Sequence, residues 1–236
     1  MSLFLSILTV LAMMALGALV TLPTPSWAAG SGGGGGSLNP STTAADLTPE
    51  EQSERALMQG IKYRDRGLKH EAKAAQAKTE KRRAKSLRRA EKAFAKALEQ
   101  QKLALKLNPN DPRVANELGY AYRKTGDFRK AIGAYNLALD LDPSFHRATE
   151  YRGQAFLALG LLDMTKQAYM TLFKHDLELA GELMQAIEDW AAERTDLTEE
   201  ETAFVAWSLE RKALATTATK LSLVAPSSPS SQKTTW

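Results

Sequence analysis

The sequence predicts an all-α protein in which pairs of helices stack into a solenoid. Apolar residues recur three and four positions apart, Gly and Pro separate the apolar runs, and no long stretch alternates apolar and polar residues. The chain has 236 residues, 44% of them hydrophobic, which is enough for a packed domain. It has no cysteine, which excludes disulfides, thiolate metal sites and a cysteine nucleophile.

The N-terminal segment, residues 1–28, is predicted to be a signal peptide. Leu3 to Leu22 is an almost unbroken apolar run, and the small residues Ser26 and Ala28 suit cleavage after Ala28. No Lys or Arg precedes the run, and about 20 apolar residues are also long enough for an uncleaved membrane anchor. Both alternatives predict an exported protein, either periplasmic or membrane-anchored and facing the periplasm.

Residues 29–49 are rich in Gly, Ser and Pro and predict a flexible linker. Residues 50–111 then predict a degenerate first repeat that carries an insertion from His70 to Leu98. The insertion is rich in Ala, Lys and Arg and lacks Pro and Gly, so we expect it to lengthen both helices of the pair.

The insertion is expected to form an extended helical hairpin. Thr79 followed by Glu80 is a plausible helix start. The facing residues of the two arms are predicted to be Ala72, Ala75 and Ala77 on the first and Leu87, Phe94 and Leu98 on the second. The alternative is one continuous helix from Leu68 to Leu107.

The hairpin is strongly basic. Lys62 to Lys106 holds sixteen basic and five acidic residues, and such a block attracts anions over roughly 8 Å at physiological salt. The predicted hairpin tip consists of Lys78, Lys81, Arg82, Arg83, Lys85, Arg88 and Arg89. An alternative function is therefore binding of an anionic surface: membrane headgroups, an envelope polymer or nucleic acid. Nucleic acid fits least, because Phe94 is the only aromatic residue from His70 to Leu107.

Residues 112–145 form the clearest repeat. Its small residues Gly119 and Ala131 let two antiparallel helices approach, Gly126 permits the reversal, and Pro143 ends the second helix. The other matching positions are Leu118, Tyr122, Tyr135 and Ala138. This 34-residue unit resembles a tetratricopeptide repeat. The resemblance implies a solenoid whose first helices line a concave groove that binds peptides or partner proteins.

Residues 146–179 follow the same plan with losses and predict a degenerate tetratricopeptide repeat, because Arg152 and Thr165 replace the usual Leu and Ala. Residues 180–215 predict capping helices, the last of which starts at a capping box of Thr198 and Glu201. Residues 216–236 are rich in Ser, Thr and Pro and predict a disordered tail.

The resemblance also selects candidate groove residues on the first helices, three and four positions apart. They are Asn116, Tyr120, Arg123, Arg147, Tyr151 and Gln154. Tyr and Arg dominate binding hot spots, although solvated helix positions are the alternative interpretation. The set lacks the Lys and Asn pattern with which chaperone-binding members of the family hold a carboxylate terminus, so binding of that kind is not expected.

No pattern in the sequence predicts catalysis. The three histidines are far apart, and the chain lacks a phosphate-binding loop, a nucleophile elbow and a zinc-protease motif. We therefore expect no enzyme activity, cofactor, metal or small-molecule substrate. Because the fold family is similar to many bacterial envelope proteins, the predicted function is a protein–protein interaction scaffold of the cell envelope that binds a segment of another protein in its groove.

Overall fold

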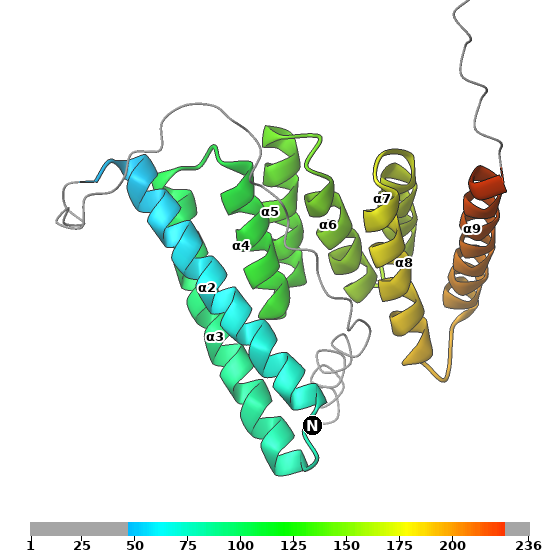
Figure 1. The fold of residues 1–236 in the computed structure, drawn as a ribbon, viewed down its shortest axis with the longest axis horizontal. Helices are drawn as coiled ribbons and strands as arrows, with labels where there is room; N and C mark the ends of the chain where they lie inside the picture. Colours follow the sequence, from blue (N-terminus) through cyan, green and yellow to red (C-terminus); the bar gives the residue numbers. More distant parts are fainter. Residues whose placement is uncertain (1–46, 225–236) are drawn as a thin grey trace, which may run out of the picture. The chain divides into compact units, whose positions relative to one another are not determined.

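The computed structural model describes residues 47–224, and within this range the chain is helical and contains no strand (Figure 1). The all-α prediction is confirmed. The helices are α2 (Pro49–Ala75), α3 (Glu80–Leu107), α4 (Pro112–Lys124), α5 (Phe128–Leu141), α6 (His146–Ala158), α7 (Leu162–His175), α8 (Leu177–Ala192) and α9 (Glu199–Val224). The predicted signal peptide or anchor and almost all of the predicted linker lie outside the described residues.

Contacts divide the chain after Glu193 into two units. The first unit contains α2 to α8, and successive helices pair as antiparallel hairpins: α2 with α3, α4 with α5, and α6 with α7. Helix α8 packs against α6 and α7, so it closes this unit. The second unit contains α9.

Side-chain caps fix where several helices begin. Thr48 and Glu51 form a capping box at α2, and the Thr79 hydroxyl accepts a hydrogen bond from the Arg82 amide at the start of α3. In the second unit, the predicted capping box of Thr198 and Glu201 is present. These caps satisfy amides that have no partner inside the helix.

The sharp reversals of the clear repeat and its successor use glycine. Gly126 between α4 and α5 has φ +85°, and Gly160 between α6 and α7 has φ +70°. Side chains rarely adopt this left-handed conformation, so glycine is favoured there. The predicted role of Gly126 is confirmed.

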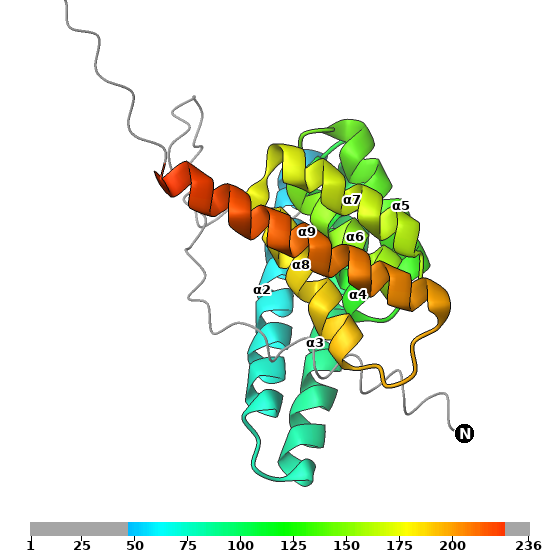
Figure 2. The same cartoon turned by 90° about the vertical axis from the view of Figure 1, so that its right-hand side faces the viewer.

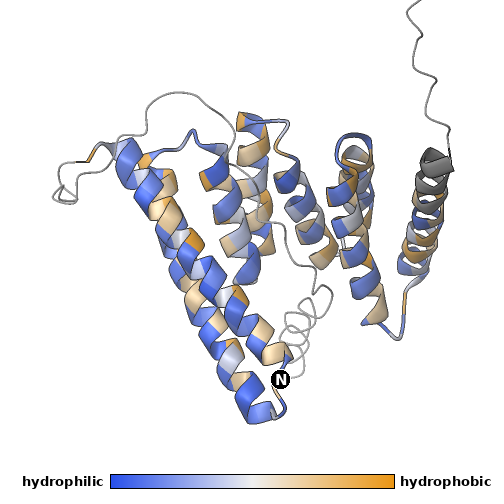
Figure 3. Cartoon of the chain, in the orientation of Figure 1, coloured by the Kyte–Doolittle hydropathy of each residue, from blue (hydrophilic) through white to orange (hydrophobic). Residues whose placement is uncertain are grey.

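The extended hairpin is also confirmed, because α2 ends at Ala75 and α3 begins at Glu80. A single helix from Leu68 to Leu107 is therefore wrong. Figures 1 and 2 show the tip of this hairpin projecting past the ends of α4 and α5, and Figure 3 shows hydrophilic residues over much of both arms.

The predicted contact between the arms was wrong in part. Ala72 and Ala75 are exposed, and the buried face of α2 instead contains Gly67, Glu71 and Ala74. Gly67 lies against the ring of buried Phe94, and this close approach sets the register between the arms. Alanines at neighbouring positions do not distinguish the two faces of a helix, so the sequence alone could not fix the register.

At the C-terminal end, α9 runs to Val224, which corrects the predicted boundary at Ala215. The chain has no Gly or Pro between Ala215 and Pro226, so no residue in this segment interrupts a helix. Within the second unit the rings of Phe204 and Trp207 stack with centroids 5.8 Å apart.

Candidate functional site

The first helices of successive hairpins, α2, α4 and α6, together with α8, present one series of polar and aromatic side chains that we call the first-helix face. All six predicted groove residues lie on α4 or α6. The neighbouring helices α2 and α8 add further charged residues to the same series.

Five of the six predicted residues contact one another, since the Arg147 guanidinium also lies 5.6 Å from the Tyr151 ring centroid. The rings of Tyr120 and Tyr151 lie with centroids 5.2 Å apart. The Arg123 guanidinium lies 5.1 Å from each ring centroid, and its Nη1 donates a hydrogen bond of 2.5 Å to Gln154 Oε1. Arg123 therefore links α4 to α6 through its cation–π contact with Tyr151 and its hydrogen bond to Gln154.

Burial limits what this cluster can offer to a ligand. Tyr120 is only 8% exposed and Asn116 only 4%. Burial also raises the pKa of the Tyr120 hydroxyl, which keeps the side chain neutral. The alternative interpretation as solvated helix positions is wrong for these two residues. Their role in binding stays a prediction, and the contact of Tyr120 with Tyr151 shows that Tyr120 helps to hold α4 against α6.

A buried carboxyl group lies beside the cluster. Glu150 is fully buried, accepts a hydrogen bond from the Gln154 amide, and lies 3.6 Å from Arg147 Nη1. Burial raises its pKa to about 7, although the positive charges of Arg123 and Arg147 oppose the shift. Glu150 therefore titrates near neutral pH.

Ion pairs connect α2 to α4 and α6 to α8. Arg64 on α2 pairs with Glu117 on α4 at 2.5 Å, and Lys124 on α4 pairs with Glu71 on α2 at 2.7 Å. Arg147 on α6 pairs with Glu182 on α8. The partners in these pairs are 35 or 53 positions apart and no local pattern marks them, so five of the residues were not predicted from the sequence: Arg64, Glu71, Glu117, Lys124 and Glu182.

Part of the first-helix face remains open to solvent. The side chains of Arg147 and Glu182 are 35% and 41% exposed, and that of Arg113, at the start of α4, is 52% exposed. Ion pairs hold these groups in defined positions, so they can form further hydrogen bonds or ion pairs with an added peptide.

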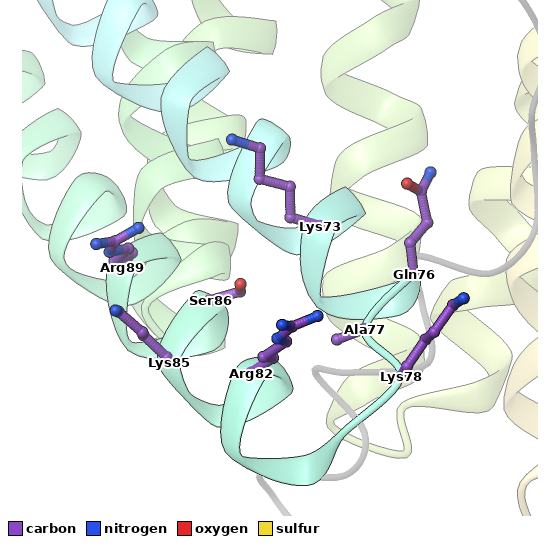
Figure 4. Close-up of a pocket in the computed structure, with 8 residues that line it drawn as sticks. All are labelled: Lys73, Gln76, Ala77, Lys78, Arg82, Lys85, Ser86 and Arg89. Atoms are coloured by element: carbon purple, nitrogen blue, oxygen red, sulfur yellow. The ribbon is translucent and has the colours of Figure 1, made fainter.

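A second candidate surface lies at the end of the α2–α3 hairpin. We call it the basic tip, and it consists of Lys69, Lys73, Lys78, Lys81, Arg82, Arg83, Lys85, Arg88 and Arg89. The last turn of α2 and the first turns of α3 enclose a shallow hollow here (Figure 4). It is lined by Lys73, Gln76, Ala77, Lys78, Arg82, Lys85, Ser86 and Arg89. The structure thus gathers four of the seven predicted tip residues around one hollow and adds Lys73.

The positive charges of the basic tip are not neutralised by the part of the protein that the structure describes. Over residues 47–224, none of its nine side chains forms an ion pair. Desolvation and the nearby charges of Lys73, Arg89 and Lys69 lower the pKa of His70. The tip therefore retains a strong positive field.

Two of the three histidines meet in the fold. The rings of His146 and His175 stack with centroids 5.4 Å apart, although the sequence separates them widely. Among the described residues, no group of three or more His, Cys, Asp or Glu side chains is arranged to hold a metal ion. Residues 47–224 also contain no helix that is long and apolar enough to cross a membrane.

Comparison with known families gives one match, to the tetratricopeptide repeat, over residues 112–145. The match has the same bounds as the repeat predicted from the sequence. It contains the groove candidates Asn116, Tyr120 and Arg123, whereas the candidates on α6 lie beyond it.

Solved structures similar to this chain include three tetratricopeptide repeat domains. The second such domain of Spaghetti (RPAP3), bound to the HSP90 peptide SRMEEVD, is 22% identical, with 53% of this chain and 99% of that chain covered and a TM-score of 0.37. The first domain of Spaghetti (RPAP3), bound to the same peptide, is 20% identical, with coverages of 57% and 98% and a TM-score of 0.39. The Sgt2 domain from Aspergillus fumigatus is 18% identical, with coverages of 72% and 84% and a TM-score of 0.39. No curated protein matches the chain.

Proposed function

We propose that the protein is a non-catalytic interaction scaffold that binds a segment of a partner protein along the first-helix face of α4, α6 and α8. The observation that carries this proposal is the pairing of Arg147 with Glu182, which leaves both side chains partly exposed on the adjacent helices α6 and α8. A partner segment that crosses the two helices can exchange hydrogen bonds with both groups.

The buried cluster beneath these groups supports the proposal. Arg123, Tyr120, Tyr151 and Gln154 join α4 to α6, so the exposed groups sit on a rigid base. A binding surface that is already ordered loses less conformational entropy when a ligand binds. In this arrangement the tyrosines position the surface, and the partly exposed charged groups at its edge make the contact.

The test compares a variant of the first-helix face with a matched control on α5. Arg147→Gln removes a partly exposed charge from the face, and Arg129→Gln removes an exposed charge from α5, the second helix of its hairpin. Tagged proteins are crosslinked in their native cells, and captured proteins are quantified by mass spectrometry. We expect Arg147→Gln to reduce recovery of a specific partner about 30-fold, the lower limit for a binding hot spot, and Arg129→Gln to leave it unchanged.

Circular dichroism must give the same helical signal for both variants and the wild type, so that loss of the partner is not loss of the fold. Equal recovery of every partner by the two folded variants would reject the first-helix face as the binding surface.

We further propose that this scaffold acts in the cell envelope. The proposal rests on the apolar run from Leu3 to Leu22 and the small residues before Ala29. Intact-mass analysis of the protein recovered from the envelope is expected to give a chain that starts at Ala29. A full-length chain in the membrane fraction would support an anchor, and a full-length chain in the cytosol would contradict export.

A further inference from the structure

We propose that the basic tip docks onto the phosphate headgroups of an anionic membrane. This surface is separate from the first-helix face, so the inference goes beyond the proposed function. Three properties of the tip carry it: uncompensated charge, projection from the fold, and a hollow built from cationic side chains.

The charge is the first property. Residues 69–89 contain nine basic residues and only two acids, Glu71 and Glu80. Glu71 is buried and already paired with Lys124, so Glu80 is the only acid there left to offset the basic residues. Since the tip forms no ion pair within the described residues, its charge is available to an external anion.

The projection is the second property. Helices α2 and α3 have 27 and 28 residues, whereas α4 and α5 have 13 and 14. At 1.5 Å per residue, the additional length of each arm is about 20 Å. Figures 1 and 2 show this length as a projection beyond the shorter hairpins. The tip can therefore touch a flat surface while α4 and α5 stay clear of it.

The hollow is the third property. Lys73 from α2 and Arg82, Lys85 and Arg89 from α3 surround it, and Ser86 lies among them with a hydroxyl donor (Figure 4). Ammonium, guanidinium and hydroxyl groups are the donors that hold a phosphate group in proteins. One headgroup phosphate can occupy the hollow while the outer cations contact neighbouring headgroups.

The remaining chemistry of the tip favours a membrane over nucleic acid. Single-stranded nucleic acid is held largely by stacking on aromatic side chains, and the one aromatic residue of α3, Phe94, is buried. No large apolar side chain is exposed from residue 69 to 89, so contact would stay at headgroup level. The same chain also carries the apolar run Leu3–Leu22, which is long enough by sequence to enter a bilayer.

The test reads the position of the tip directly. Because the chain lacks cysteine, Gln76→Cys places a single fluorophore at the tip of the full-length protein, and Arg129→Cys places the control fluorophore on α5. Vesicles contain phosphatidylcholine alone or with 30 mol% phosphatidylglycerol, and a trace of lipid with a spin-labelled headgroup quenches nearby fluorophores. Each fluorophore is quenched only by nearby headgroups. Quenching at position 76 therefore reports docking of the tip and not insertion of residues 3–22.

We expect quenching of the label at position 76 on phosphatidylglycerol vesicles, little on phosphatidylcholine, and little at position 129 on either. Quenching should disappear in 0.5 M NaCl, where the screening length is only a few ångströms. The combined variant Lys78→Gln, Arg82→Gln, Lys85→Gln should weaken binding about 100-fold, because each basic residue near an anionic surface contributes about a factor of five. The charge-conserving set Lys78→Arg, Arg82→Lys, Lys85→Arg should bind like the wild type.

Three results would overturn the inference. One is equal quenching at position 76 on both kinds of vesicle, or none on either. Another is release from vesicles by 10 mM inorganic phosphate at constant ionic strength, which would indicate a site for a free ion. The third is tighter binding of duplex DNA than of vesicles at physiological salt. A negative result in the vesicle test would not affect the proposal for the first-helix face. The Arg147→Gln variant is expected to change partner capture and not vesicle binding, so the two proposals can fail separately.

Discussion

Single residues decide how closely the helices approach. A Cβ atom at Gly119 on α4 would lie 2.5 Å from Cε1 of Tyr135, a fully buried residue of α5. No Cβ atom tolerates such a distance, and the surrounding core leaves the ring little room to move. Gly133 on α5 provides the contrast, because a Cβ atom there meets nothing within 4 Å.

We therefore predict opposite effects for two identical substitutions. Gly119→Ala should lower the free energy of unfolding by about 1 to 3 kcal/mol through overpacking. Gly133→Ala should raise it by about 0.5 to 1 kcal/mol, because alanine is the better helix former. Urea denaturation followed by circular dichroism measures both. Two changes of the same sign would show that the close contact of Gly119 with Tyr135 does not control the packing.

Glu150 gives a prediction about pH. The ordinary pKa of this carboxyl is 4.5, and burial raises it to about 7 in the folded protein. Protonated Glu150 therefore favours folding below pH 4.5, and this contribution is lost as the pH rises through about 7. Glu150→Gln stays neutral, so its stability relative to the wild type should increase by on the order of 3 kcal/mol from pH 4.5 to 8. Melting temperatures across this range provide the measurement, and parallel curves for the two proteins would contradict the shift.

For single residues, the sequence predicted the structural roles of the small side chains but not the contacts of the polar and aromatic side chains. Gly119 and Gly126 stand out because they occupy fixed positions in a 34-residue repeat. Tyr120 and Arg123 fit a binding surface and a solvated surface equally well when only their spacing is known. Their burial depends on Tyr151 and Gln154 of the next hairpin, whose approach no local pattern specifies.

At the scale of secondary-structure elements, a largely buried ion pair connects the extended hairpin of α2 and α3 to the next hairpin, α4 and α5. Lys124 on α4 and Glu71 on α2 lie 2.7 Å apart, with side chains 13% and 9% exposed. The Lys124 ammonium also lies 4.9 Å from the centroid of the Phe94 ring on α3. Burial lowers the pKa of Lys124, and the charge of Glu71 opposes this shift.

Removing one partner should cost more than removing both. Lys124→Met leaves the Glu71 carboxylate buried without its cation and should lower the free energy of unfolding by about 2 to 4 kcal/mol. The double variant Lys124→Met, Glu71→Gln should recover at least about 1 kcal/mol of that loss. A double-mutant cycle by urea denaturation checks the coupling. Strictly additive effects would mean that the pair does not couple α2 to α4.

The sequence predicted the extended hairpin but not its internal register. A long segment without Gly or Pro predicted extended helices, and the threonine cap at residue 79 favoured a hairpin, but the sequence left one continuous helix from Leu68 to Leu107 as the alternative. The register depends on which face of α2 meets Phe94, and alanines at positions 72, 74 and 75 are equivalent in hydrophobicity.

On the scale of the whole molecule, the structure separates two surfaces by chemistry. The first-helix face has charges paired across adjacent helices and an aromatic cluster beneath them. The basic tip has unpaired cations at the end of the longest hairpin of the first unit. A scaffold with both surfaces could hold a partner segment and a membrane at the same time, because the two sites use different residues.

Site-specific photocrosslinking tests the central claim, a partner bound along the first helices, most directly. A photoreactive amino acid replaces Gln185, exposed on α8 three positions from Glu182, or Arg129 on α5, in otherwise identical proteins expressed in the native cells. We predict that irradiation joins one discrete partner to the chain from position 185 and not from position 129. Crosslinks to the same protein from both positions, or only from position 129, would contradict it.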